Sequence, residues 1–361
     1  MSEAKKEQPD IRLSSDPIIR KSLCSNEKSI NCIEDLSNEI FYEIFDYLNG
    51  YDVYKAFSNF NNPFENLLIK SSLLMKIQIS STSEFDYHYK ELINLNKRHI
   101  LSFHFNNELI LGTIMQSIFL FYLQYLPGLS HLTACLDHCS TNVGKIYSMV
   151  FKLPLLKYFK SVISDYPASD LTLPIATKGR YSSIEYLCMY HFLTLDHLPH
   201  LLSYLPPLIY LNCFDIFQSN VVVQFDILTP LMNLKHLSIS VHNLTFDRFE
   251  KFLIKISSQL RFLSVKVQGI NKKYLEADRW EQLIIQYIPY LTKFTSTYTE
   301  ENIDNTFQVI SSHALINRFI SSFWSNHQWL FEILIDYDLI TYSIRPYTYA
   351  LRTFFINQCF L

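Results

Sequence analysis

Apolar residues return along the chain in a short phrase, Φ-x-x-Φ-x-Φ, in which Φ is apolar and x is any residue. The clearest copies run from Leu234 to Ile239 and from Leu260 to Val265. Alternation over so short a run predicts one strand per phrase, and the residues between two phrases must return to start the next strand. The phrases begin at Ile100, Leu129, Leu156, Ile184, Leu208, Leu234, Leu260 and Leu291, which are 24 to 31 residues apart.

Prolines support this periodicity independently of the leucines. They stand shortly before the phrases, where a connecting helix has to end. One strand and its return cannot bury their own apolar face, so neighbouring repeats must stack into a curved α/β solenoid. The prolines are Pro127, Pro154, Pro206, Pro207, Pro230 and Pro289.

This organisation resembles the leucine-rich repeats, whose period is about 20–29 residues. The chain departs from that family eight residues after each anchor, where the family has Asn or Cys. The family's asparagine ladder is therefore missing, and the resemblance implies an irregular solenoid with uneven helices. The residues at these places are Glu108, Asp137, Ser164, Phe192, Ile216, His242, Gln268 and Thr299.

Two further segments extend the predicted sheet. Alternation from Leu73 to Ile79 predicts a strand before the first repeat. After the last repeat, residues 327–349 favour two strands joined around Asp336–Asp338, and such a hairpin would cover the end of the sheet. The predicted domains are a disordered tail at 1–30, a helical module at 31–72, the solenoid at 73–312 and a C-terminal strand cap at 313–361.

The stretch before the repeats carries three short helical patterns. Ile40 and Ile44 lie on an apolar face of the first helix, and Asn49-Gly50 is a natural stop for it. Asp52 is expected to cap the second helix, and Asn62-Pro63 to begin the third. A unit of this size buries little surface, so we expect it to pack on a partner or on the rest of the chain.

The same stretch is similar to the F-box, a module that docks on the Skp-family adaptor of cullin-RING ubiquitin ligases. Ser37 follows Leu36 where the family usually has proline, and the family's late tryptophan is missing. The alternative is a generic amphipathic helix cluster that caps the solenoid. The adaptor-binding residues that the resemblance implies are Leu36, Ser37, Glu39, Ile40, Ile44, Phe45, Leu48, Val53 and Phe57.

Composition narrows the class of protein. The 361 residues are 48% hydrophobic, which excludes general disorder. A formal net charge of −3 gives no electrostatic footprint for nucleic acid or an anionic membrane. The seven cysteines are odd in number and irregularly spaced, so free thiols in a reducing compartment, cytoplasmic or nuclear, are expected.

One segment allows a different interpretation. Leu109–Leu126 is an 18-residue run without a charge, which meets the usual minimum for a membrane span. A helix sandwiched between repeats, apolar all round because it is covered all round, explains the run as well. Polar residues such as Gln116 and Gln124 within the run favour the second explanation.

Catalytic and metal-binding patterns are weak. His131, Cys135, His138 and Cys139 are good zinc ligands by type, but they lie on a repeat phrase, where strand geometry sends His131 and Cys135 outward. His191, His197 and His200 are expected to be surface or hydrogen-bonded core histidines. No nucleophile, metalloprotease or phosphate-loop motif is present in the sequence, so we expect a non-catalytic protein without a cofactor.

The remaining candidate surface is the concave face of the predicted sheet. The residue two places after each anchor should point into it: Ser102, His131, Tyr158, Tyr186, Tyr210, His236, Phe262 and Lys293. At 15% aromatic residues chain-wide, about one aromatic is expected in such a column, and four occur. Exposed aromatic residues are typical binding anchors. We therefore predict that Tyr158, Tyr186, Tyr210, His236 and Phe262 bind a protein substrate.

These features together predict a substrate receptor that links a bound protein to a ubiquitin ligase through the Skp-family adaptor. The alternatives are a repeat scaffold without a ligase role and a membrane-associated protein, with an enzyme last.

Overall fold

A computed structural model describes residues 33, 36–48, 50–57, 75–79, 100–106, 123, 126–136, 143–163, 171–177, 179–218, 225, 230–301, 318–336 and 339–347. The chain divides into two compact units, one that ends at Tyr47 and one that begins at Leu48. The domain boundaries drawn from the sequence remain predictions.

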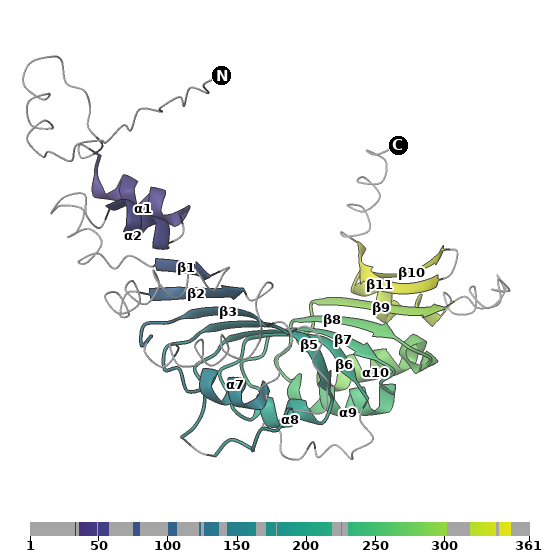
Figure 1. The fold of residues 1–361 in the computed structure, drawn as a ribbon. Coiled ribbons are helices and arrows are strands. Elements are labelled where there is room, and N and C mark those ends of the chain that lie inside the picture. The colour runs from purple at the N-terminus through teal and green to yellow at the C-terminus, as the bar shows by residue number, and fades with distance from the viewer. Residues whose placement is uncertain are drawn as a thin grey trace, which may run out of the picture. The chain divides into compact units, whose positions relative to one another are not determined.

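The second unit is a mixed α/β structure built on an 11-stranded, mostly parallel sheet (Figure 1). From β1 to β9, each strand pairs in parallel with the next in sequence. β11 then pairs antiparallel with β9, and β10 with β11, so the predicted terminal hairpin is confirmed. A strand also lies at every repeat phrase. The strands are β1 (Met75–Ile79), β2 (Ile100–Asn106), β3 (His131–Leu136), β4 (Tyr158–Ile163), β5 (Tyr186–Thr194), β6 (Tyr210–Phe217), β7 (His236–His242), β8 (Phe262–Gln268), β9 (Lys293–Glu301), β10 (Trp329–Asp336) and β11 (Leu339–Pro346).

Five of the repeat phrases enter their strands through the same turn. The amide N–H of each of these anchors donates to a carbonyl three residues earlier, as from Leu208 to Leu205 and from Leu234 to Leu231, both at 3.1 Å. The next residue joins the sheet, since the Lys235 N–H donates to the Ile209 carbonyl at 2.9 Å. All eight anchors are buried. The apolar anchor therefore fixes where each strand starts, and its period becomes the period of the sheet.

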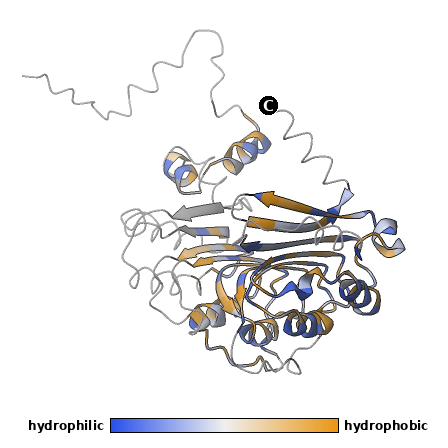
Figure 2. Ribbon diagram, turned by 90° about the vertical axis from the view of Figure 1, so that its right-hand side faces the viewer, coloured by the Kyte–Doolittle hydropathy of each residue, from blue (hydrophilic) through white to orange (hydrophobic). Residues whose placement is uncertain are grey.

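α7, α8, α9 and α10 lie on one face of this sheet (Figure 1). They carry hydrophobic and hydrophilic residues together, as amphipathic helices do (Figure 2). Trp280 joins this layer to the strands, because its ring lies 4.9 Å from both Phe246 and Phe294, centroid to centroid. The helices of this unit are α2 (Gly50–Phe57), α7 (Val143–Val150), α8 (His197–Leu202), α9 (Phe246–Ile256), the 3-10 helix η5 (Lys272–Leu275), α10 (Ala277–Tyr287) and α12 (Ser322–Asn326).

The connecting helices end where the prolines predict. α7, α8 and α10 finish shortly before Pro154, Pro206 and Pro289 respectively. Their lengths are uneven, 8, 6 and 11 residues, in agreement with an irregular return between strands.

A buried polar chain crosses the core between α7 and the sheet. The Tyr147 hydroxyl lies 2.8 Å from the Ser161 hydroxyl and 2.6 Å from His191 Nε2. His191 Nδ1 lies 3.3 Å from the Phe192 carbonyl oxygen, so a proton on Nδ1 satisfies the network. Burial lowers the pKa of His191 to about 4. His191 is thus a neutral, hydrogen-bonded core histidine, as the sequence predicted.

The N-terminal helices begin and end elsewhere than predicted. α1 (Asn38–Asp46) ends before Asn49-Gly50, and Gly50 instead begins α2. Asp52 therefore lies in the first turn of α2 and does not cap it; its carboxylate still suits the helix dipole there. The predicted third helix, from Asn62-Pro63, lies outside the described residues, which hold two helices in this stretch.

Candidate functional site

The face of the sheet opposite α7–α10 is called the open face here. Strand alternation separates the two faces: Phe159 is buried and contacts Tyr147 of α7, with ring centroids 5.7 Å apart, while its neighbour Tyr158 points the other way. The predicted column lies in register across the open face, because each member pairs with the next. The members in order are Ser102, His131, Tyr158, Tyr186, Tyr210, His236, Phe262 and Lys293.

This column, the first row, is a strip of rings. The ring centroids of Tyr210 and His236 are 5.9 Å apart, and those of His236 and Phe262 are 5.8 Å apart. At the other end the His131 and Tyr158 rings stack at 5.8 Å. The Tyr186 and Tyr210 rings lie 6.2 Å apart, so the rings form two runs, His131–Tyr158 and Tyr186 to Phe262. These spacings slightly exceed the separation of neighbouring strands, about 4.8 Å. His131, Tyr186 and His236 are exposed.

Tyr158 and Tyr210 of the first row have raised pKa values, mainly because they are partly buried. Partial burial, with Cys188 beside it, raises the pKa of Tyr158 to about 12. Burial likewise raises the pKa of the Cys188 thiol, although its hydrogen bond with Tyr158 opposes that shift. Tyr158 and Tyr210 therefore offer hydroxyl groups near neutral pH, and the buried Cys188 thiol beside the row is a poor nucleophile.

A second aromatic group lies further along the strands and was missed by the sequence reasoning. Phe192 contacts Phe217 at 5.4 Å, and Phe217 stacks on His242 at 4.9 Å, centroid to centroid. Tyr190 contacts Phe214 at 6.0 Å. The signal was available: continuing the alternation past the repeat phrase, from Tyr186 to Tyr190 and Phe192, points these rings to the open face.

A bulge places one carboxylate in this group. The pairing of β6 with β7 shifts between Cys213 and Ile216, and Asp215 has a φ of 64° there. Asp215 Oδ1 lies 2.5 Å from His242 Nε2. With regular alternation, Asp215 would point to the helix side of the sheet. The bulge turns its carboxylate to the open face instead.

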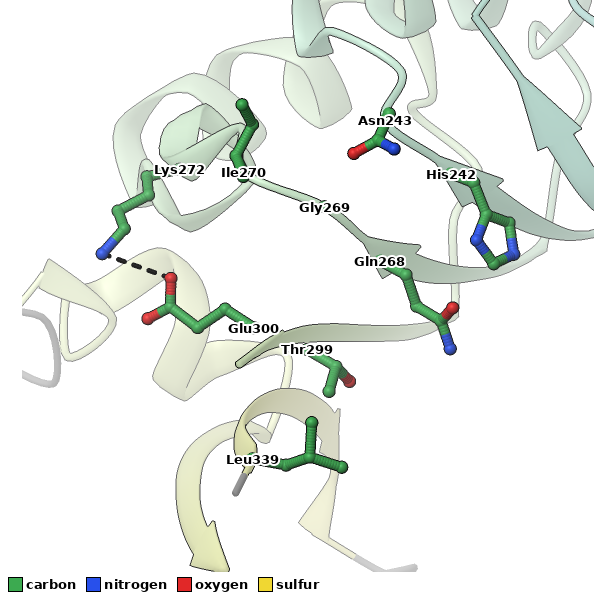
Figure 3. Close-up of a pocket in the computed structure, with 9 residues that line it drawn as sticks. All are labelled: His242, Asn243, Gln268, Gly269, Ile270, Lys272, Thr299, Glu300 and Leu339. Carbon is green, nitrogen blue, oxygen red and sulfur yellow. Dashed lines mark ion pairs between the residues drawn. The ribbon is translucent and has the colours of Figure 1, made fainter. Parts of the chain in front are cut away.

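A pocket of about 640 Å³ opens at the ends of β7, β8 and β9 (Figure 3). His242, Gln268 and Thr299 lie on one side of it; on the other, Lys272 Nζ pairs with Glu300 Oε2 at 3.2 Å. The Tyr342 hydroxyl also donates to Glu300, at 2.8 Å. The pocket continues the open face, because His242, Gln268 and Thr299 occupy paired positions on successive strands. Its walls offer both donors and acceptors.

α1 exposes the apolar stripe that the F-box resemblance implies. Ile40 and Ile44, one turn apart on α1, have 43% and 36% of their surface exposed, and Leu36, two residues before the helix begins, is 38% exposed. Phe41 and Phe45 are buried. A stripe at this spacing forms one side of a helix, so α1 has a buried side and a separate exposed apolar side.

The other residues implied by the resemblance have mixed environments. Ser37 is the N-cap residue of α1, but through its carbonyl, which accepts the Ile40 N–H at 3.2 Å; its side chain makes no capping bond. The hydroxyl of Ser37 instead helps to lower the pKa of Glu39, after a larger effect of the Glu39 backbone N–H. Leu48 is exposed, Val53 buried and Phe57 half-buried.

The described residues give no support to a zinc site or to a membrane-spanning helix. No group of three or more His, Cys, Asp or Glu side chains that could hold a metal occurs among them, and His138 and Cys139 lie outside them. Within the same ranges, no helix is long and apolar enough to cross a membrane. Leu109–Leu126 lies outside those ranges except for Leu123 and Leu126.

Comparison of the chain with protein-family models and with curated proteins finds no match in either case.

Proposed function

We propose that the chain is a non-catalytic protein-binding receptor of the F-box type, with an irregular leucine-rich-repeat-like solenoid that holds a protein substrate. The observation that carries the binding role is the first row: rings from neighbouring strands, in register and partly exposed, on one face of the sheet. Flat aromatic residues in such an array are typical anchors of protein interfaces.

The ligase role rests on the F-box resemblance together with the exposed stripe of Leu36, Ile40 and Ile44. An apolar stripe on a short helix gains stability when a partner covers it. In this proposal the Skp-family adaptor covers the stripe, and the sheet presents the substrate. The receptor then contributes proximity, which raises the effective concentration of the substrate at the ligase. A cytoplasmic or nuclear location belongs to the same proposal.

Adaptor binding by the full-length chain tests the ligase role. Ile44→Asp should weaken binding to the purified Skp-family adaptor at least about tenfold, because it would bury an unpaired charge in the interface. Tyr42→Asp is the matched control: Tyr42 is also exposed on α1 but lies about 200° around the helix from Ile40. Titration calorimetry with both variants measures the difference.

Equal binding by the wild type and both variants, or no binding by any of them, would leave the repeat scaffold without a ligase role. Ser37→Pro sharpens the test. The φ of Ser37 is −70°, within the range that proline requires, so this change restores the family's residue without backbone strain. If the resemblance is functional, Ser37→Pro should bind the adaptor at least as tightly as the wild type.

A further inference from the structure

Over β2–β9, the described outward side chains of the open face carry more positive than negative charge. Lys160, Lys266 and Lys293 occupy outward positions of β4, β8 and β9. The one carboxylate among these described side chains is that of Asp215, which is already bonded to His242. Further along the sheet, Arg345 of β11 pairs with Glu332 of β10, and Asp336 of β10 is a further acid.

Part of the helix layer is different, because charges of α9, η5 and α10 are paired at short range. Arg279 bonds both Asp247 and Glu250, and Lys273 Nζ lies 2.9 Å from Asp247 Oδ2. The bond from Lys273, followed by that from Arg279, lowers the pKa of Asp247. Asp247 and Glu250 thus have cations of their own, whereas Lys266 and Lys293 are exposed on the open face.

The cations stand at one end of the ring strip. The first row runs from Tyr210 through His236 and Phe262 to Lys293, each paired with the next. Lys266 lies four residues after Phe262 on the same strand, and both Lys266 and Lys293 are exposed. Lys160 is placed differently, with its ammonium 5.1 Å from the centre of the Tyr190 ring. The face therefore has an aromatic part over β4–β7 and a cationic part over β8–β9.

From this arrangement we infer that the open face binds an acidic segment of its protein partner, extended across the strands. An apolar or aromatic side chain of the segment lies on the rings of Tyr186 and Tyr210, and its carboxylates lie beside Lys266 and Lys293. This inference rests on the proposed function, since it specifies the chemistry of the substrate that the receptor holds.

The length of the segment follows from the strand spacing. From Tyr158 on β4 to Lys293 on β9 there are five strand spacings, about 24 Å in all. An extended chain covers that distance in about seven residues. The ligand is therefore a short linear segment. A few residues separate its apolar or aromatic anchor residue from its acidic residues.

Selection of peptides tests the inference without a known partner. A phage-displayed library of random dodecapeptides is panned against the full-length chain, and in parallel against the double variant Lys266→Glu/Lys293→Glu. The wild type should enrich peptides that combine an aromatic residue with several Asp or Glu residues, and the double variant should not. The matched control is Lys152→Glu/Lys251→Glu, which reverses two lysines that are exposed on the helix side; it should select the same peptides as the wild type.

The best selected peptide is then synthesised and titrated by fluorescence anisotropy. Reversing both lysines should weaken its binding about fivefold or more, as expected for two exposed ion pairs. Raising the salt from about 50 mM to about 300 mM should weaken binding to the wild type and have little effect on the double variant, because salt screens exposed charges.

Three outcomes would overturn the inference: selection of neutral or basic peptides, equal binding by the double variant, or tighter binding of an oligothymidine than of the best peptide. The variant Tyr186→Ala/Tyr210→Ala distinguishes this failure from failure of the proposed function. If it abolishes binding of a non-acidic peptide, the open face is a protein-binding surface with another specificity. If it leaves every selected peptide bound, or if no peptide is enriched, the open face is not the protein-binding surface, and the ligase role is decided separately by adaptor binding.

Discussion

The two faces of the sheet are made by the same strands and differ in what their side chains contact. On the helix side, residues such as Phe159, Leu187 and Phe294 are fully buried against the helix layer. On the open face, their immediate neighbours Tyr158, Tyr186 and Lys293 are paired in register with the equivalent residues of the adjacent strands, and Tyr186 and Lys293 are exposed. Each strand therefore has two sets of alternating residues. One set packs against the helices and stabilises the fold, and the other forms a surface that is available for recognition.

Adjacent residues of β5 provide the sharpest test of this separation. Leu187→Ala should reduce the free energy of unfolding by about 2–5 kcal/mol, because it leaves a cavity in the core. Tyr186→Ala should cost under about 1 kcal/mol, because that side chain is 40% exposed. Urea denaturation of both variants measures the difference; similar losses would show that the open face also holds the fold together.

The buried histidine gives the helix side a pH dependence. The pKa of His191 is about 4 in the folded protein and about 6.5 when unfolded. Since the unfolded chain binds the proton more tightly, stability should fall as the pH falls from about 6.5 towards 4, by at most about 1.4 kcal/mol per pH unit. His191→Gln should flatten this slope, while the control His131→Gln, on the open face, should keep it. A slope that is the same in all three proteins would contradict the prediction.

Two glycines outside the packed faces should show a smaller effect. Gly269 has a φ of 148°, and an added Cβ would lie 2.7 Å from Asn243 Oδ1 and 3.1 Å from Asn243 N. Gly269→Ala should therefore cost about 1–3 kcal/mol. Gly179→Ala should cost less, about 1 kcal/mol, since the φ of Gly179 is 88° but nothing lies within 4 Å of the added Cβ. Thermal unfolding of the pair separates crowding from backbone strain, and a larger loss for Gly179→Ala would contradict this explanation.

The sequence predicted the strands well because the repeat phrase combines two signals that tertiary contacts do not override. The buried anchor fixes the turn, and the alternation fixes which residues face outward, so the register of the first row could be predicted from spacing alone. The C-terminal hairpin was predicted from its two strand-like segments, and β10 and β11 pair along their length, from Trp329 with Pro346 to Asp336 with Leu339.

The sequence was less informative about features that depend on local backbone geometry, such as where a helix starts and where a strand bulges. Asp52 has the chemistry of a cap, but Gly50 and Tyr51 also join the helix, so it falls in the first turn. Tyr190 and Phe192 follow the alternation of β5, but Asp215 and Phe217 reach the open face through the bulge of β6, which no simple period describes. The positive charge of the open face was hidden because net charge sums over both faces. Its lysines stand out only once the acids of the helix layer are seen to have partners of their own.

The sequential order of the parallel strands also bears on how the sheet assembles. Partners in the first row are separated by as few as 24 residues, from Tyr186 to Tyr210, and by at most 31, from Phe262 to Lys293. The entropy lost on closing a loop depends only on the logarithm of its length, so each pairing costs nearly the same wherever it occurs. No parallel strand needs a partner that is distant in the sequence. We therefore expect the sheet to grow outward from any stable pair of strands, with folding kinetics governed by nucleation and propagation and not by the length of the array.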